Sequence, residues 1–182
     1  MSSKRLSKLD APKNITATEK VLNEDDFIVS KTDTRGTIVY CNEIFAQMAG
    51  YSFKELIGAN HNLIRHPDMP KLAFKILWDR IQAKEEFFGF VKNLCADGGY
   101  YWVYAYFTPD LDTNGNIIGY TSVRRKPPQS AIDQIMPIYK TLLDAERSGG
   151  VESSMKILNE LLDKYDFEYN EFVINLQIGA NL

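Results

Sequence analysis

Apolar residues recur along this chain with two spacings, in an order that predicts strands, then helices, then more strands. Residues 27–40 alternate around a turn, which is typical of two short strands. Residues 42–58 follow a helical spacing and predict one short helix, capped by Asn42, and a further helical turn. Residues 69–84 predict the longest helix of the first half, with Asp68 as its N-cap.

Alternation returns after residue 86 and predicts three more strands. They cover residues 87–95, 100–108 and 116–125, and the turns between them are rich in glycine. We expect Pro109 to end the middle strand, because proline cannot donate a hydrogen bond to a sheet. Two strands, several small helices and three strands together predict an α+β fold, a five-stranded antiparallel sheet with helices on one face.

The chain divides at a proline-rich boundary near residue 127. Beyond this boundary, apolar residues keep a helical spacing that a Gly-Gly pair interrupts, which predicts C-terminal helices. The start of the chain carries positive charge without an apolar stretch behind it. We therefore expect a flexible N-terminal segment over residues 1–21, one compact domain over residues 22–126 and a helical C-terminal extension over residues 127–182.

Composition narrows the class of protein. Of the 182 residues, 45% are hydrophobic and 25% are charged, with a net charge of −3, so we expect neither disorder nor a nucleic-acid-binding surface. No apolar run could span a bilayer and no secretory signal is visible, so we expect a cytoplasmic protein without direct membrane insertion. The two cysteines have no CxxC partner and predict no metal site. Without a Ser/His/Asp set, a P-loop or paired acid–base carboxylates, we do not expect an enzyme.

Several short motifs resemble the PAS fold over roughly residues 22–126. They are Asn42, Gly50-Tyr51, Glu55-Leu56-Ile57-Gly58, the Gly98 hairpin, Tyr101-Trp102 and Ile118-Gly119-Tyr120. A narrower match covers residues 61–70, which read HNLIRHPDMP, and continues in Trp78 and Val91-Lys92-Asn93. This stretch resembles the PAS domain of the bacterial aerotaxis receptor and its energy-taxis relatives.

The resemblance implies a cofactor and a role in signal transduction. In that family the pocket holds FAD, and the redox state of the flavin is passed to a chemotaxis signalling domain. The receptor also carries a membrane span and a long signalling coiled coil, and this sequence shows neither. We therefore expect a stand-alone redox sensor that docks, from the cytoplasm, on a membrane-bound chemoreceptor-type protein, with a homodimer as a further assembly.

Two other functions stay open at this point. Many PAS-like domains act only in protein–protein interaction or dimerisation, so the chain could be a cofactor-free module. A haem-binding gas sensor is the other alternative, with His61 or His66 as the axial ligand of the iron.

Four polar residues are candidates for the cofactor site that the resemblance implies. Asn93 offers a donor and an acceptor, which suits the polar edge of a flavin. Arg65 could hold a diphosphate, or the charge of a reduced flavin, through its planar donors. His66 and His61 carry imidazole groups, which ordinarily titrate near neutral pH, and could hydrogen-bond the cofactor. Light-sensing flavin PAS domains have a cysteine where this chain has His61, so we expect no thiol adduct.

Three further candidates also have structural explanations. Trp78 could stack on a flavin or adenine ring, although its position on the apolar face of a helix is also that of a core residue. Asp68 and Asn42 both precede helices and are expected to act as N-caps. A cap at Asp68 would also hold the loop that carries Arg65 and His66.

The middle strand of the predicted hairpin has two different faces. In the register of flavin-binding PAS domains its pocket side carries Val103, Ala105 and Phe107. Its outer side then carries three large aromatic residues, Trp102, Tyr104 and Tyr106. A patch of this kind usually marks an interaction site, unless the N-terminal segment or the C-terminal helices cover it. We expect this outer face, with the apolar faces of the C-terminal helices, to form the output surface.

Overall fold

The computed structural model of the chain describes residues 5–179 and contains one antiparallel sheet with the strand order β2-β1-β5-β4-β3. The predicted five-stranded α+β fold is thereby confirmed. The strands are β1 (Ile28–Thr32), β2 (Ile38–Cys41), β3 (Phe87–Leu94), β4 (Tyr100–Leu111) and β5 (Ile117–Arg125). The first four residues of the predicted N-terminal segment and the last three of the extension lie outside the described part.

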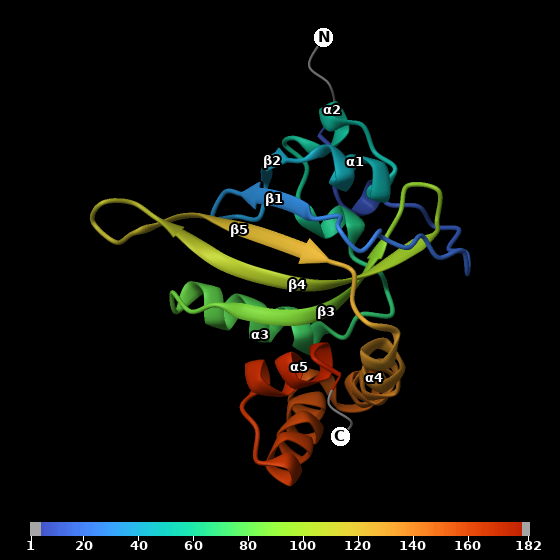
Figure 1. The fold of residues 1–182 in the computed structure, drawn as a ribbon, viewed down its shortest axis with the longest axis vertical. Helices are drawn as coiled ribbons and strands as arrows, with labels where there is room; N and C mark the ends of the chain where they lie inside the picture. Colours follow the sequence, from blue (N-terminus) through green and yellow to red (C-terminus); the bar gives the residue numbers. More distant parts are fainter. Residues whose placement is uncertain (1–4, 180–182) are drawn as a thin grey trace.

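Short helices occupy the connection between β2 and β3. They are α1 (Glu43–Ala49), α2 (Phe53–Leu56), the 3-10 helix η2 (His61–Ile64) and α3 (Lys71–Gln82). Two further helices follow the sheet, α4 (Gln129–Tyr165) and α5 (Tyr169–Gln177). Figure 1 shows α1 and α2 near the β2 end of the sheet, and α4 and α5 beyond its β3 end.

Helix α1 begins and ends where the sequence predicts. The side-chain oxygen of Asn42 accepts hydrogen bonds from the backbone N–H of Phe45 at 3.2 Å and of Val29 at 3.0 Å. Gly50 ends the helix in a left-handed conformation, with φ of 74°. Asn42 therefore joins the start of α1 to strand β1, which confirms its capping role.

The predicted N-cap of the long helix is wrong. Helix α3 begins at Lys71 after Pro70, and Asp68 instead forms an ion pair with Lys92 of β3 at 2.7 Å. The first free N–H groups of α3 are satisfied by Glu146 of α4, whose carboxylate accepts from Lys71 at 2.9 Å and from Leu72 at 2.8 Å. A local sequence pattern cannot reveal a capping group 75 residues away.

Pro109 does not end the middle strand, contrary to the sequence-based prediction. Strand β4 continues to Leu111, and Pro109 lies opposite Tyr120 of β5. Strand β3 begins at Phe87, which pairs with Phe107, so β4 has a neighbour on only one side at Pro109. Proline is tolerated at such an edge position because its missing N–H leaves fewer ladder bonds unmade.

The apolar core has two clusters, and Val91 and Phe107 pack against both. The first cluster includes Val103 and Ala105; of the three residues predicted to face the pocket, Phe107 lines the cavity described below and these two do not. The second cluster joins α3, α4 and α5 to the outer aromatics Trp102 and Tyr104, which are only 7% and 8% exposed. The C-terminal helices therefore cover this face, which removes Trp102 and Tyr104 from the expected output surface.

Helix α5 covers the edge strand β3. The side chain of Asn170 accepts a hydrogen bond from the N–H of Phe88 at 3.2 Å and donates one to the carbonyl of Glu86 at 3.1 Å. The ring of Tyr169 stacks on Phe87 with ring centroids 5.5 Å apart. These contacts satisfy backbone groups that an open edge would present to another chain.

Helix α4 is two helices joined at a kink. Gly150 has φ of 71° and ψ of −169°, so the backbone leaves the helical region there, as the Gly-Gly pair predicts. The chain reverses after this point and packs its second half against the first, through residues such as Leu142 and Leu158.

The segment before β1 also packs on the sheet. Its backbone pairs with the start of β4, where Lys20 donates to the carbonyl of Tyr100 at 2.8 Å and Tyr100 donates to the carbonyl of Thr18 at 2.9 Å. Gly98 in the β3–β4 turn has φ of 88°, and a Cβ there would lie 2.1 Å from the carbonyl oxygen of Asn14. Only glycine fits this contact. The boundaries at residues 21 and 126 remain predictions.

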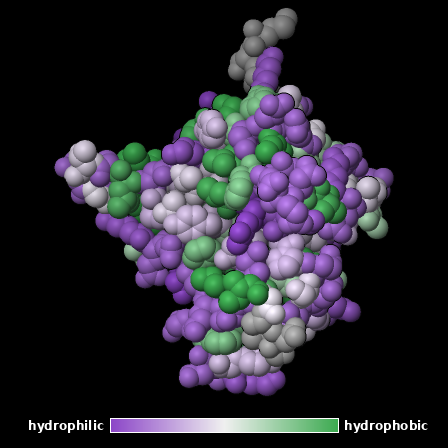
Figure 2. Space-filling view, viewed as in Figure 1, coloured by the Kyte–Doolittle hydropathy of each residue, from purple (hydrophilic) through white to green (hydrophobic). Residues whose placement is uncertain are grey.

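The surface carries scattered apolar groups. The β4–β5 hairpin projects from the body (Figure 1), and hydrophobic atoms gather toward its tip in Figure 2, where Leu111 and Ile118 are exposed. Within residues 5–179 no helix has the length and hydropathy needed to cross a membrane.

Candidate functional site

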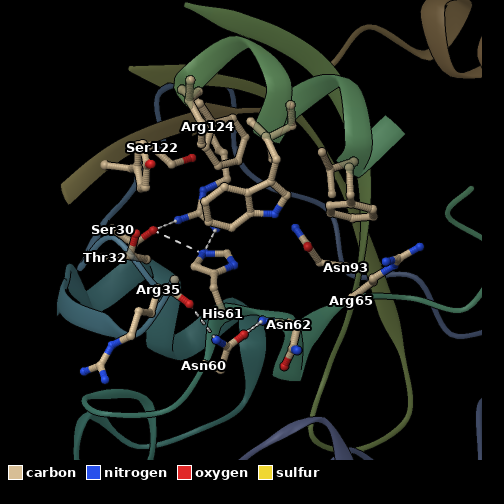
Figure 3. Close-up of a pocket in the computed structure, with 18 residues that line it drawn as sticks. Ser30, Thr32, Arg35, Asn60, His61, Asn62, Arg65, Asn93, Ser122 and Arg124 are labelled. Carbon is tan, nitrogen blue, oxygen red and sulfur yellow. Dashed lines mark hydrogen bonds between the residues drawn. The ribbon is translucent and has the colours of Figure 1, made fainter. Parts of the chain in front are cut away.

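A cavity of about 350 Å³ lies between the sheet, α3 and the loop that contains η2 (Figure 3). Its apolar wall is formed mainly by one side of α3, through Phe74, Leu77, Trp78 and Ile81. The strands contribute a mostly polar set, Ser30, Thr32, Val91, Asn93, Phe107, Tyr120, Ser122 and Arg124. This volume is within the usual range of ligand sites, about 300–1,000 Å³.

Four of the seven predicted site residues line this cavity. They are His61, Arg65, Trp78 and Asn93. They come from three different elements, which the fold brings to one place: the η2 loop, α3 and β3. The ring of Trp78 meets Tyr120 of β5 edge-on, with centroids 5.4 Å apart, so α3 is packed against the sheet at this point.

Three buried polar atoms in the cavity have no hydrogen-bond partner among the described residues. They are Nδ2 of Asn93, Oγ of Ser122 and Nε of Arg124. A buried donor without a partner costs about 1–3 kcal/mol, and such groups are rare in native proteins. Their convergence on one cavity is the property of a site that receives polar groups from a ligand.

Arg124 is a buried cation at the inner end of the cavity. Its side chain is 2% exposed, lies over the ring of Phe45 at 4.6 Å and donates to Oγ of Ser30. Burial lowers the pKa of Arg124 to about 10, so the guanidinium stays protonated at neutral pH. Within residues 5–179 no carboxylate pairs with it. An uncompensated buried charge favours an electron-rich or anionic ligand.

His61 contacts both Arg124 and Phe45. Its Nε2 is 3.3 Å from Oγ of Ser30 and 3.4 Å from Nη1 of Arg124, and its ring stacks on Phe45. Burial, together with the charge of Arg124, lowers the pKa of His61 to about 3, so the ring is neutral at physiological pH. Because Arg124 can only donate, Nε2 accepts and the proton sits on Nδ1.

The mouth of the cavity carries two arginines from different loops. Arg65 lies over the ring of Phe74 at 4.1 Å and donates to the carbonyl of Met69 at 3.2 Å. Arg35, from the β1–β2 turn, is on the other side in Figure 3, with Asn60 and Asn62 between them. The guanidinium of Arg35 pairs with Asp33 at 3.4 Å and its side chain is 83% exposed, so Arg65 is the better placed of the two to bind an anionic group such as a phosphate.

Three predicted site residues lie outside the lining. His66 is buried behind the loop, where its Nδ1 accepts from the N–H of Asp68 at 3.1 Å, and burial with the charge of Lys92 lowers its pKa to about 4. Asp68 forms an ion pair with Lys92, and Asn42 caps α1. Their positions support the η2 loop and α1, so any effect on a ligand is indirect.

Three residues of the lining, Arg124, Ser122 and Ser30, were not predicted from the sequence. The alternation of residues 117–125 does give Tyr120, Ser122 and Arg124 one common face. Two polar residues on the pocket-side face of a predicted strand were the available signal. The pairing of β5 with β1 and the burial of Arg124 could not be inferred from the sequence, because both depend on the tertiary structure.

This sheet order, with short helices after the second strand and a cavity beneath them, is that of the PAS fold. Residues 38–124 match the family described as the PAS fold. The chain carries a PAS domain of the aerotaxis-receptor type, as the loop sequence indicates.

Two curated proteins are similar to this chain over most of its length. The chain is 35% identical over 150 residues to the aerotaxis receptor of Escherichia coli (strain K12). The matched region covers 82% of this chain and 29% of the receptor. The chain is also 29% identical over 118 residues to the nitrogen fixation regulatory protein of Klebsiella pneumoniae. This match covers 64% of this chain and 24% of that protein. The chain thus spans less than a third of the length of these relatives.

Solved structures agree on the fold. A light-oxygen-voltage domain studied with a flavin analogue matches with a TM-score of 0.54 and 21% identity, over 61% of this chain and 83% of that one. The light-state LOV domain of the blue-light photoreceptor Aureochrome1 matches with a TM-score of 0.52 and 23% identity, over 68% and 91%. At this level of identity the match shows the fold alone.

Proposed function

We propose that the chain is a redox sensor that binds FAD in this cavity and relays the redox state of the flavin to a membrane-bound chemoreceptor-type protein. One observation carries the proposal: an apolar slot against α3 that ends at the unpartnered polar atoms of Asn93, Ser122 and Arg124. A flavin ring needs the same combination, an apolar slot with donors and acceptors at its polar edge.

The residues present fit a flavin. Phe74 and Trp78 would flank the ring, and the amide of Asn93 would bind its polar edge. Arg65, at the mouth, would bind the diphosphate. FAD supplies the electron chemistry, and the protein supplies binding, orientation and electrostatics. Arg124 would stabilise negative charge on the bound ligand, because a cation within a low-dielectric cavity interacts strongly with it.

The alternatives are less consistent with the geometry. A haem would need a free histidine nitrogen, yet Nε2 of His61 lies between Ser30 and Arg124, and His66 is outside the lining. A cofactor-free module would leave a cavity of about 350 Å³ and three unpartnered polar atoms without a purpose. Neither cysteine lines the cavity, so a thiol adduct is not expected.

Similarity to the aerotaxis receptor supports the relay. We place the protein in the cytoplasm, recruited to a membrane through its partner or acting as a homodimer. Because Trp102 and Tyr104 are buried by α4 and α5, the partner would contact other surfaces, including the C-terminal helices themselves.

The test is a flavin titration. Protein purified without denaturant should show the yellow flavin spectrum, or should acquire it when mixed with FAD, with quenching of Trp78 fluorescence. Asn93→Ala should weaken FAD binding by about fivefold, since a hydrogen bond to a ligand contributes on the order of 1 kcal/mol. Asn159→Ala, at an exposed position of α4, is the matched control and should bind normally. A folded protein that takes up no FAD, or takes up haem instead, would refute the proposal.

A further inference from the structure

Two sides of helix α3 contact different parts of the molecule. One side lines the cavity through Phe74, Leu77 and Trp78. The other side packs on α4 and α5, where Leu72, Ala73 and Ile76 meet residues such as Ile135 and Phe172 around a void of only about 10 Å³. Close packing of this kind transmits displacement, because there is no free volume to absorb it. A displacement of α3, the cavity wall, should therefore displace α4 and α5 as well.

The start of α3 is held by α4 and not by its own loop. Pro70 occupies the N-cap position and offers no side-chain acceptor. The carboxylate of Glu146 takes that role with two hydrogen bonds, from Lys71 at 2.9 Å and Leu72 at 2.8 Å, and Ser154 donates to it at 3.4 Å. A negative group at this position also interacts favourably with the helix dipole.

Glu146 also acts electrostatically on the cavity mouth. The positive charge of Arg65, which lines the cavity, interacts with the carboxylate of Glu146. Arg65 in turn lies over Phe74 and donates to the carbonyl of Met69, just before α3. One carboxylate from α4 thus binds the start of the cavity wall and acts through its charge on the cation at the cavity entrance.

We propose that Glu146 is a positioning residue that holds the α3 wall in its ligand-binding position and so links cavity occupancy to the docking of α4 and α5. The identity of the ligand as FAD rests on the proposed function; the positioning role does not. The linkage is reciprocal by thermodynamic necessity: if docked C-terminal helices raise ligand affinity, bound ligand stabilises their docking by the same factor.

The experiment uses the full chain with Glu146→Ala and Glu146→Gln, and FAD as the probe. Glu160→Ala, at an exposed position on the same helix α4, is the control. We expect Glu146→Ala to weaken FAD binding by about tenfold, within the usual range of coupling between sites. Glu146→Gln should fall between it and wild type, because its amide oxygen can still accept but carries no charge.

Amide hydrogen exchange separates positioning from simple loss of stability. FAD should slow exchange in α5 in the wild type and in the Glu160 variant, and this ligand-dependent effect should vanish in Glu146→Ala. Equal FAD affinity and equal ligand-dependent protection in all variants would overturn the proposal. If the wild type binds no FAD, the proposed function fails, whereas faster exchange at Lys71 and Leu72 in Glu146→Gln still supports the positioning role. Unchanged exchange at those two amides overturns it.

Discussion

At the residue scale, the cavity is built around a charge that the fold does not neutralise. Arg124 is buried, stacks on Phe45 and donates to Ser30, but no carboxylate within residues 5–179 pairs with it. An uncompensated buried ion lowers the stability of the ligand-free protein, while it strengthens the binding of an electron-rich ligand. Stability and ligand affinity should therefore respond to this residue in opposite directions.

The variant Arg124→Met tests this opposition. Methionine keeps much of the side-chain length without the charge, so the free energy of unfolding of the ligand-free protein should be unchanged or higher by on the order of 1 kcal/mol. FAD affinity should fall by tenfold or more, because the cation at the inner end is lost. Urea unfolding and FAD titration measure the two quantities. Arg125→Met, at the exposed neighbouring position, is the control. A parallel loss of stability and affinity would contradict the prediction.

The two histidines predict a dependence of stability on pH. Burial lowers the pKa of His61 to about 3 and that of His66 to about 4, whereas both titrate near 6.5 in the unfolded chain. Between about pH 6.5 and 4 the unfolded state binds more protons than the folded state, so acid favours unfolding. The free energy of unfolding, measured with urea, should fall steadily across this interval. His66→Gln and His61→Gln should each flatten the slope; an unchanged slope in the double variant would contradict this assignment.

At the element scale, α5 protects the outer edge of the sheet. Asn170→Ala removes one hydrogen bond to Phe88 of β3 and one to Glu86 just before the strand, and should lower the free energy of unfolding by about 1–2 kcal/mol. Amide exchange at Phe88 should become faster, because its N–H loses its partner. Asn175→Ala on the same helix, whose side chain bonds only to the carbonyl of Glu171, is the control and should leave exchange at Phe88 unchanged. Equal exchange in both variants would show that packing alone protects this edge.

At the scale of the whole molecule, the C-terminal helices are part of the folded unit. A chain that ends at Lys126 loses the cover over Trp102 and Tyr104 and the cap that Glu146 provides. We expect this truncated chain to self-associate and to bind FAD more weakly, as size-exclusion chromatography and titration would measure. The double substitution Trp102→Ser and Tyr104→Ser should restore a monomer without restoring affinity. A truncated chain that is monomeric and binds FAD normally would contradict the prediction.

Local patterns in the sequence determined the elements themselves. Alternating apolar residues specify the strands, and Asn42 and Gly50 specify the ends of α1, because caps and periodicity act over a few neighbouring residues. The motif over residues 61–70, with Trp78 and Asn93, located part of the cavity, because a resemblance to a known family can be recognised from short stretches of sequence. His61, Arg65, Trp78 and Asn93 could be predicted in this way.

Only the tertiary structure decided which distant groups meet. Asp68 looks like a helix cap in the sequence, but Lys92 draws it to β3 and Glu146 replaces it. Arg124 looks like one more charged residue near a strand end until β1 and β5 pair and bury it beside His61. Packing and electrostatics act through space across separations of many tens of residues, and a local pattern carries no information about them.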